Sequence, residues 1–359
     1  MKEHSQSHIK VESVVDKFYF PPPGQGLGSQ DQRRPEELAL EPGVAQRISQ
    51  FTQDNQEVRK GTSQRWALWR HGYLVRIEGD FHETVDVASL RKTWHAMMVG
   101  AAIKQGKIPS CHQKISVWQP ELEGNKKEAT WRDVIIQAAG FDYPYGDYPD
   151  FKPGQMWTYS DWNPYHLCNA LAKVYGKKDF YDNYDDVARE AYFEAIGMEG
   201  WSTRIVFDRS SQMYDGVRFI LSLEHMGRLG LLVLARGTWK DRELIPRWFV
   251  EELETKQTYG MRVNYEGPYD GKVSLSKYGE RFSECPYGYM TWVNTDGDYF
   301  PGADRDWAFG AGAGGTIVLW NYKKGIVFAG VGIKVEPSSN SIPHILERSI
   351  TGANPLLNK

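Results

Sequence analysis

Ser89-Leu90-Arg91-Lys92 is the stretch that decides the fold, because of the segments on either side of it. Residues 66–80 before it have strand character, and residues 92–103 after it form an apolar run typical of a helix. Side chains at positions i and i+3 share one face of a helix. Ser89 and Lys92 are therefore expected to meet at the start of a helix that follows a strand.

A lysine can activate a neighbouring serine without histidine if its amine loses a proton near neutral pH. The apolar neighbours Trp94 and Met97 could bury the Lys92 ammonium and lower its pKa. Taken alone, however, the spacing favours a helix N-cap serine and a solvated lysine.

The same spacing recurs twice, at Ser7/Lys10 in a polar tail and at Ser274/Lys277 in a stretch rich in Gly and Tyr. Only Ser89/Lys92 has a strand before it and an apolar helix after it. The motif at Ser89 is therefore the candidate worth pursuing.

The chain has 359 residues, of which 41% are hydrophobic and 25% charged, as in an ordinary globular protein of one large or two closely packed domains. A formal net charge of −3 suggests neither a nucleic-acid nor a membrane partner. Three widely spaced cysteines form neither a disulfide framework nor a metal knuckle, so reduced thiols are expected. Without a signal-like N-terminus or a membrane-spanning run, we expect a cytoplasmic protein, although an already processed export form stays open.

Three regions are expected along the chain. Residues 1–42 would be an extended, Pro-rich arm, residues 43–105 plus 255–359 a sheet domain, and residues 106–254 a mainly helical inserted domain. We expect helices over 44–58, 89–105, 130–136, 163–174, 224–234, 246–253 and 342–349, and strands over 64–70, 73–79, 289–293, 315–320 and 325–331.

Residues 153–161 supply a second candidate, in which a turn presents Tyr159 just before a helix. A phenol beside an ammonium can act as a general base and later as a general acid. Similar tyrosine contexts recur, so the pattern alone favours a packing tyrosine in an N-cap loop. These other tyrosines are Tyr145, Tyr148, Tyr181 and Tyr184.

The third candidate is the glycine-rich run 309–316, which precedes an apolar strand. Glycines allow a ligand to approach the backbone closely, and an N–H group there could pair with that of Ser89 as an oxyanion hole. A phosphate loop fits poorly, because no Lys-Ser/Thr follows and the glycines precede a strand. A flexible loop remains the alternative.

Metal and histidine chemistry have little support in the sequence. The nine histidines show no metal-binding spacing, and His95 is expected to be structural. No G-x-S-x-G elbow supports a Ser-His-Asp triad, although the sequence does not exclude one. We therefore expect neither a metal nor an organic cofactor.

The order and spacing of these elements resemble the serine β-lactamase/penicillin-binding-protein superfamily. The similarity is to its class C-like branch, which includes family VIII carboxylesterases, D-aminopeptidases and 6-aminohexanoate-oligomer hydrolases. It spans roughly residues 64–335 and is carried by residues 87–108, 130–135, 153–161, 224–232, 239, 245–246 and 309–316.

The resemblance implies an α/β (α+β) fold of the β-lactamase/transpeptidase type. Helices would flank an antiparallel sheet built from both termini, with an all-helical domain inserted. It also implies cleavage of a small ester or amide through an acyl-enzyme. An acyltransferase or a catalytically silent scaffold of the same fold, and the oligomeric state, stay open. The implied roles are nucleophile for Ser89, general base and acid for Lys92 and Tyr159, oxyanion donors for the N–H groups of Ser89 and Ala313, and substrate contacts for Asp161, Gly312 and Gly314.

Two positions depart from the family pattern. Gly310 stands where Lys or His usually begins the third motif, which weighs against substrates that carry a carboxylate. Asp161 stands where Asn is common, so a carboxylate near Lys92 is expected to raise the pKa of that lysine. Arg305 or Lys272 could supply a substitute cation for the first position.

Overall fold

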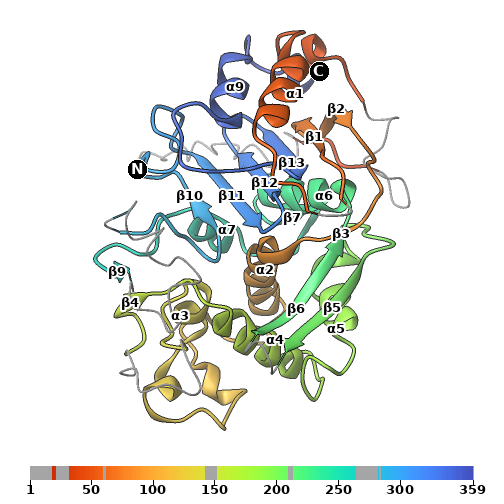
Figure 1. The fold of residues 1–359 in the computed structure, drawn as a ribbon. Coiled ribbons are helices and arrows are strands. Elements are labelled where there is room, and N and C mark those ends of the chain that lie inside the picture. The colour runs from red at the N-terminus through yellow and green to blue at the C-terminus, as the bar shows by residue number, and fades with distance from the viewer. Residues whose placement is uncertain are drawn as a thin grey trace, which may run out of the picture.

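The computed structural model describes residues 18–21, 32–59, 62–141, 152–208, 213–263, 282 and 284–358, and the statements below concern these residues. One antiparallel sheet with strand order β10-β11-β12-β13-β1-β2 joins segments from both ends of the chain (Figure 1). Its strands are β1 (Arg65–Arg70), β2 (Tyr73–Glu78), β10 (Trp292–Val293), β11 (Trp307–Gly312), β12 (Thr316–Asn321) and β13 (Ile326–Val331). The predicted sheet built from both termini is confirmed.

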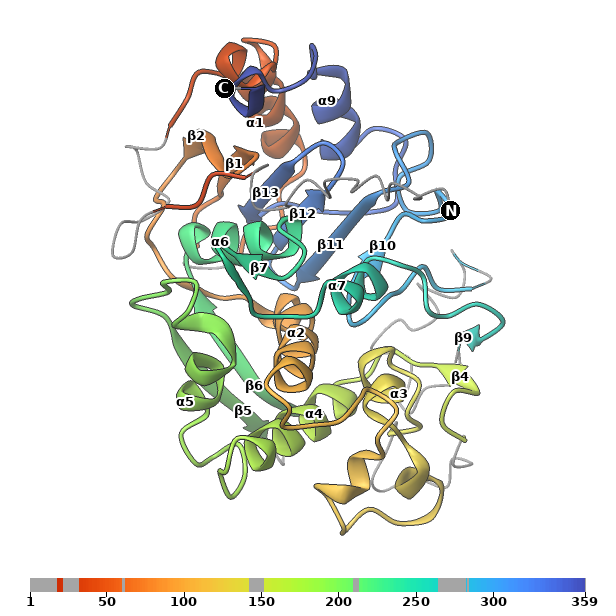
Figure 2. The same cartoon turned by 180° about the vertical axis from the view of Figure 1, so that it is seen from behind.

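Helices cover both faces of this sheet, so every residue of β1, β12 and β13 is buried. Helices α1 (Val44–Asp54) and α9 (Ile342–Arg348) lie on one face and α6 (Leu223–Leu234) on the other (Figures 1 and 2). Gly227 and Gly230 let α6 approach closely, because a Cβ atom on them would lie 2.5 Å from Trp69 and 2.6 Å from Val327.

Helix α2 (Arg91–Lys104) runs from the sheet into the second half of the molecule (Figure 2). One of the shorter helices there, α3 (Trp131–Ile135), has a side-chain cap at its start. Thr130 accepts a hydrogen bond from the N–H of Asp133 at the start of α3, and Asp133 in turn accepts from the N–H of Thr130. Helix α4 (Trp162–Val174) follows the Tyr159 segment directly.

The inserted region is not purely helical, which corrects the sequence-based expectation. A second sheet of order β3-β6-β5 runs beside α4 and α5 (Tyr184–Ala188) (Figure 1). Its strands are β3 (Val85–Asp86), β5 (Ser202–Asp208) and β6 (Met213–Leu221). The sequence of β5 contains the β-branched residues Thr203, Ile205 and Val206 and the aromatic Phe207, which is a strand signal that the sequence-based prediction missed.

The glycine-rich run also differs from its prediction as a loop before a strand. Residues up to Gly312 form β11, in which Gly310 pairs with Val318, and only residues 313–315 make the turn into β12. Glycine is depleted in strands, so the residue propensities of this segment did not indicate strand β11. Conversely, the strand expected over 289–293 shrinks to the two residues of β10.

The remaining short elements complete the fold. They are α7 (Arg247–Leu253), β4 (Met156–Trp157), β7 (Thr238–Trp239), β8 (Arg242–Glu243), β9 (Arg262–Val263), η3 (Pro35–Leu38), η5 (Ile115–Val117), η6 (Gly124–Glu128), η7 (Arg189–Phe193) and η8 (Pro355–Asn358). No helix in the described ranges is both long and apolar enough to cross a bilayer.

Two partly buried histidines, His71 and His166, are expected to make the fold less stable in acid. Burial, together with the charge of Arg70, lowers the pKa of His71 to about 4, and burial lowers that of His166 to about 3. Both are therefore neutral in the folded protein and take up protons on unfolding below about pH 6.5. We expect the free energy of unfolding to fall from pH 6.5 towards pH 4, by on the order of 2 kcal/mol per histidine at pH 4.5.

Denaturant titrations at pH 7, 5.5 and 4.5 measure this loss. His71→Asn and His166→Asn should each flatten the dependence, whereas the exposed His112→Asn should leave it unchanged. Equal free energies of unfolding at pH 7 and 4.5 would show that the two histidines are not held neutral.

Candidate active site

Ser89 lies in the 3₁₀ turn η4 (Ala88–Leu90), between strand β3 and helix α2. The turn is tight, because Ala88 adopts a left-handed φ of 48° that costs a non-glycine residue energy. The Ala88 N–H group donates to Asp86 Oδ1 at 2.8 Å, which stabilises this conformation. The predicted placement of Ser89 at the start of a helix after a strand is therefore observed.

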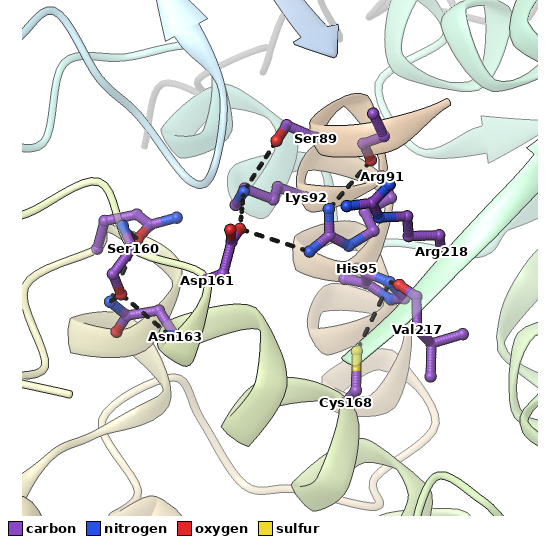
Figure 3. Close-up of polar contacts among 12 residues, drawn as sticks. Ser89, Arg91, Lys92, His95, Ser160, Asp161, Asn163, Cys168, Val217 and Arg218 are labelled. Atoms are coloured by element: carbon purple, nitrogen blue, oxygen red, sulfur yellow. Dashed lines mark hydrogen bonds and ion pairs between the residues drawn. The ribbon is translucent and has the colours of Figure 1, made fainter. Parts of the chain in front are cut away.

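Lys92 lies one turn further along and points at Ser89 (Figure 3). Its side chain is 1% exposed, and its Nζ atom lies 3.1 Å from Ser89 Oγ and 2.8 Å from Asp161 Oδ1. The first distance suits proton transfer between the serine and the lysine. The second places a carboxylate against the ammonium, which favours the protonated form of the amine.

The ring of Tyr159 contacts the ammonium group of Lys92. The Lys92 Nζ atom is 4.4 Å from the centroid of the Tyr159 ring, which is a cation–π contact. The ring stacks on Trp292 of β10 at 5.9 Å and meets Tyr287 edge-on at 6.4 Å, so aromatic packing fixes its position. The structure thus brings together Ser89, Lys92, Tyr159 and Asp161.

The end of β11 touches the Ser89 turn directly. A Cβ atom on Gly312 would lie 2.1 Å from the carbonyl oxygen of Val87 and 3.0 Å from the backbone nitrogen of Leu90. Only glycine permits this approach. Ala313 is the next residue, so its backbone leaves the strand beside η4.

Gly310 and Gly314 of this run have different surroundings. The N–H group of Gly314 donates to Glu57 and its carbonyl accepts from Gly332, so both backbone polar groups serve the turn. A Cβ atom on Gly310 would lie 2.5 Å from Leu90 Cδ1. This strand position therefore packs against the η4 turn.

Arg305, one of the two possible substitute cations, does not reach this strand end. Arg305 lies before the start of β11 and donates to the carbonyl of Thr295. The six residues of β11 separate it from η4 by roughly 20 Å at ~3.3 Å per residue. Other positions named above lie outside the described residues: Ser7, Lys10, Tyr145, Tyr148, Lys272, Ser274 and Lys277.

His95 is buried and structural, as expected. Its Nδ1 atom lies 3.1 Å from the Tyr184 hydroxyl and its Nε2 atom 3.0 Å from the Val217 carbonyl, with Cys168 Sγ at 3.6 Å (Figure 3). Burial raises the pKa of Tyr184 well above its usual value, so the tyrosine stays protonated and donates to Nδ1. The ring thereby ties together α2, α4, α5 and β6.

All three cysteines are free and buried, which suits the reduced thiols expected from the sequence. Within the described ranges, no group of three His, Cys, Asp or Glu side chains could hold a metal ion.

Three neighbours of the site escaped the sequence analysis: Asp86, Arg91 and Trp292. Asp86 stands two residues before Ala88, which has a positive φ. This spacing is a sequence signal for an Asx-turn. Arg91 lies inside the serine-x-x-lysine motif, but it occupies a position at which the motif allows any residue. Trp292 is far from Tyr159 in sequence, so only the fold could show their contact.

The fold and the arrangement of Ser89, Lys92 and Tyr159 point to one family of proteins. Comparison with known proteins identifies this family. The profile of the Beta-lactamase family matches residues 66–339, so the chain belongs to the Beta-lactamase family. No curated protein sequence matches the chain.

Several solved structures share its fold at low sequence identity. A proposed β-lactamase from Bacteroides dorei DSM 17855 is 15% identical with a TM-score of 0.63, over 88% of this chain and 98% of that one. A proposed 6-aminohexanoate-dimer hydrolase from Bacillus anthracis is 14% identical with a TM-score of 0.59, over 94% and 87%. EstCE1, described as a hydrolase with promiscuous acyltransferase activity, is 12% identical with a TM-score of 0.58, over 86% and 99%.

Proposed function

We propose that this protein is a serine hydrolase that cleaves a small, uncharged ester or amide through an acyl-enzyme on Ser89. One observation carries the proposal: the buried Lys92 Nζ atom lies 3.1 Å from Ser89 Oγ and against the Tyr159 ring. Burial of an ammonium costs free energy even when a carboxylate such as that of Asp161 lies beside it. Activation of a nucleophile accounts for that cost.

The proposed reaction begins when neutral Lys92 takes the proton of Ser89 while Oγ bonds to the acyl carbon. The carbonyl oxygen becomes negative and accepts hydrogen bonds from the N–H groups of Ser89 and Ala313. Tyr159 and Lys92 pass the proton to the leaving alcohol or amine, and the bond to the acyl carbon breaks. A water molecule, deprotonated by the same pair, then attacks the acyl carbon. The bond between the acyl carbon and Ser89 Oγ breaks, the pair returns its proton to Oγ, and the carboxylic acid leaves.

The descriptions of two structural relatives support a hydrolase. One structural relative is named for hydrolysis of a 6-aminohexanoate dimer, and another is described as a hydrolase with promiscuous acyltransferase activity. A panel of p-nitrophenyl esters, short linear amides and nitrocefin tests the proposal. Turnover of none of them would favour a silent scaffold.

An acyltransferase is the second candidate, favoured by the description of EstCE1. It would use the same residues, with an alcohol or amine in place of water. Added alcohols or amines should then accumulate as acylated products at the expense of the free acid. Unchanged release of acid in their presence would support the hydrolase.

We expect weak or absent β-lactamase activity compared with turnover of a neutral ester. A β-lactam carries a carboxylate, and Gly310 offers it no cation at the oxyanion strand. An unpaired carboxylate in an aromatic site would lose hydration without compensation. The ratio of kcat/KM for nitrocefin and for p-nitrophenyl butyrate measures this preference. Nitrocefin turnover equal to or faster than that of the ester would contradict it and point to another cationic group.

A further inference from the structure

We propose that Arg91 is a positioning residue for this site: it orients the peptide group whose N–H binds the oxyanion, and it holds Asp161. The inference rests on the proposed function and adds a residue to it. Arg91 is 0% exposed and begins helix α2, directly between the serine and the lysine of the motif (Figure 3). Two contacts of its guanidinium carry the argument.

The first contact is with the carbonyl group that precedes the nucleophile. Arg91 Nη1 donates to the carbonyl oxygen of Ala88 at 3.1 Å, and the backbone N–H of Arg91 donates to the same oxygen. The Ala88 carbonyl and the Ser89 N–H belong to one planar trans peptide and point in opposite directions. Fixing the carbonyl therefore fixes the direction of the Ser89 N–H.

The same contact also strengthens the N–H group as a donor. A cation hydrogen-bonded to the carbonyl polarises the peptide and makes its N–H more positive. The backbone hydrogen bonds of the turn start from the nitrogens of Leu90 and Arg91, so none of them uses the Ser89 N–H group. Arg91 thus acts on the oxyanion through the peptide and not by direct contact.

The second contact is with the carboxylate of Asp161. Arg91 Nη2 lies 3.7 Å from Asp161 Oδ1, the same oxygen that accepts a hydrogen bond from Lys92 at 2.8 Å. Lys92 must lose its proton to act as a base, and that step removes one cationic partner of Asp161. Arginine keeps its charge at any working pH, so the carboxylate is never left without a partner.

Only a guanidinium suits both contacts, because its two terminal nitrogens diverge in a rigid fork. A lysine at this position has one nitrogen and cannot reach the Ala88 carbonyl and Asp161 together. Glutamine could donate to the carbonyl but would bring no charge. These differences make Arg91→Gln, Arg91→Lys and Arg91→Met an informative series.

The experiment measures kcat and KM for p-nitrophenyl butyrate, its pH profile and the affinity for a boronic acid that forms a tetrahedral adduct on Ser89. We expect Arg91→Met to lower kcat about 30-fold, below the ~100-fold typical of deleting an oxyanion donor, because Arg91 acts indirectly. KM should change less than about threefold, and boronate affinity should fall in parallel with kcat. Arg91→Gln and Arg91→Lys should recover part of the loss in kcat.

Without Arg91, Lys92 becomes the sole cationic partner of Asp161 among the residues that the structure describes. The rise of kcat with pH should therefore move to higher pH in Arg91→Met and Arg91→Gln. A merely structural arginine would not shift this profile.

Arg70→Met is the matched control. Arg70 is also a buried arginine that donates to backbone carbonyls, those of Leu38, Ala39 and Gly352, at the end of β1. It should lower thermal stability and leave kcat, the pH profile and boronate affinity unchanged.

Two results would overturn the proposal while the proposed function stands. One is a folded Arg91→Met variant that keeps kcat within about threefold when Ser89→Ala is inactive. The other, decisive if Arg91→Met does not fold, is an Arg91→Gln variant with wild-type kcat and pH profile. An active Ser89→Ala variant would instead remove the proposed function itself.

Discussion

Ser89→Ala should abolish turnover of the best substrate, with a loss of kcat/KM of at least ~1000-fold, and leave the fold intact. The activity depends on an oxygen nucleophile, and no other group replaces it once Oγ is removed. The structural cost is small, because even a capping serine contributes only about 1 kcal/mol and Ser89 caps neither η4 nor α2. Steady-state kinetics and a denaturant titration of the same preparation measure the two effects.

Serines with the same local spacing serve as controls for this substitution. Ser7→Ala and Ser274→Ala each remove the serine of another serine-x-x-lysine pair and leave Ser89 and Lys92 intact. Both variants should keep close to wild-type activity. If Ser89→Ala retains more than a few percent of the wild-type activity, Ser89 is not the nucleophile.

Lys92→Ala should be comparably damaging, with a loss of at least ~100-fold in kcat, because general-base catalysis typically contributes 10²–10⁴-fold. Lys92→Arg should be hardly better, since a guanidinium does not deprotonate at working pH. Arg91 remains beside Asp161 in both variants, so the carboxylate keeps one cationic partner. Activity of Lys92→Arg within tenfold of the wild type would show that Lys92 serves only as a positive charge.

The pH–rate profile further distinguishes Lys92 as a general base from Lys92 as a mere positive charge. Activity should rise with pH as the coupled Lys92/Tyr159 pair loses a proton. Asp161 lies 2.8 Å from the amine and favours its charged form, so Asp161→Asn should move the rise to lower pH. A profile that is flat from mildly acidic to alkaline pH would argue against this base.

Much of the fold could be predicted from hydrophobic periodicity and capping. The strands around the His71-Gly72 turn lie within a residue of their predicted bounds, and both turn residues have the positive φ that such hairpins require. Helix α6 begins after Ser222, which caps it as a serine before an apolar run should. These signals are local, so one sequence suffices to find them.

What the sequence did not predict depends on contacts between distant segments. Strand β11 is rich in glycine because it packs against η4 and α2, and this tertiary demand overrides strand propensity at Gly310 and Gly312. Similarly, Ser89 and Lys92 follow from helical spacing, but the Tyr159 ring reaches Lys92 only through its packing on Trp292. The role of Arg91 emerges only when the direction of the Ala88 carbonyl is known.

Covalent labelling tests the central claim, that Lys92 activates Ser89, most directly. The protein is treated with a fluorophosphonate that modifies activated serines, and the adduct is located by peptide mass spectrometry. We predict one adduct per chain, on Ser89, formed at least ~100-fold more slowly in Lys92→Ala and absent in Ser89→Ala. No adduct, an adduct on another serine, or equal labelling rates with and without Lys92 would contradict the account.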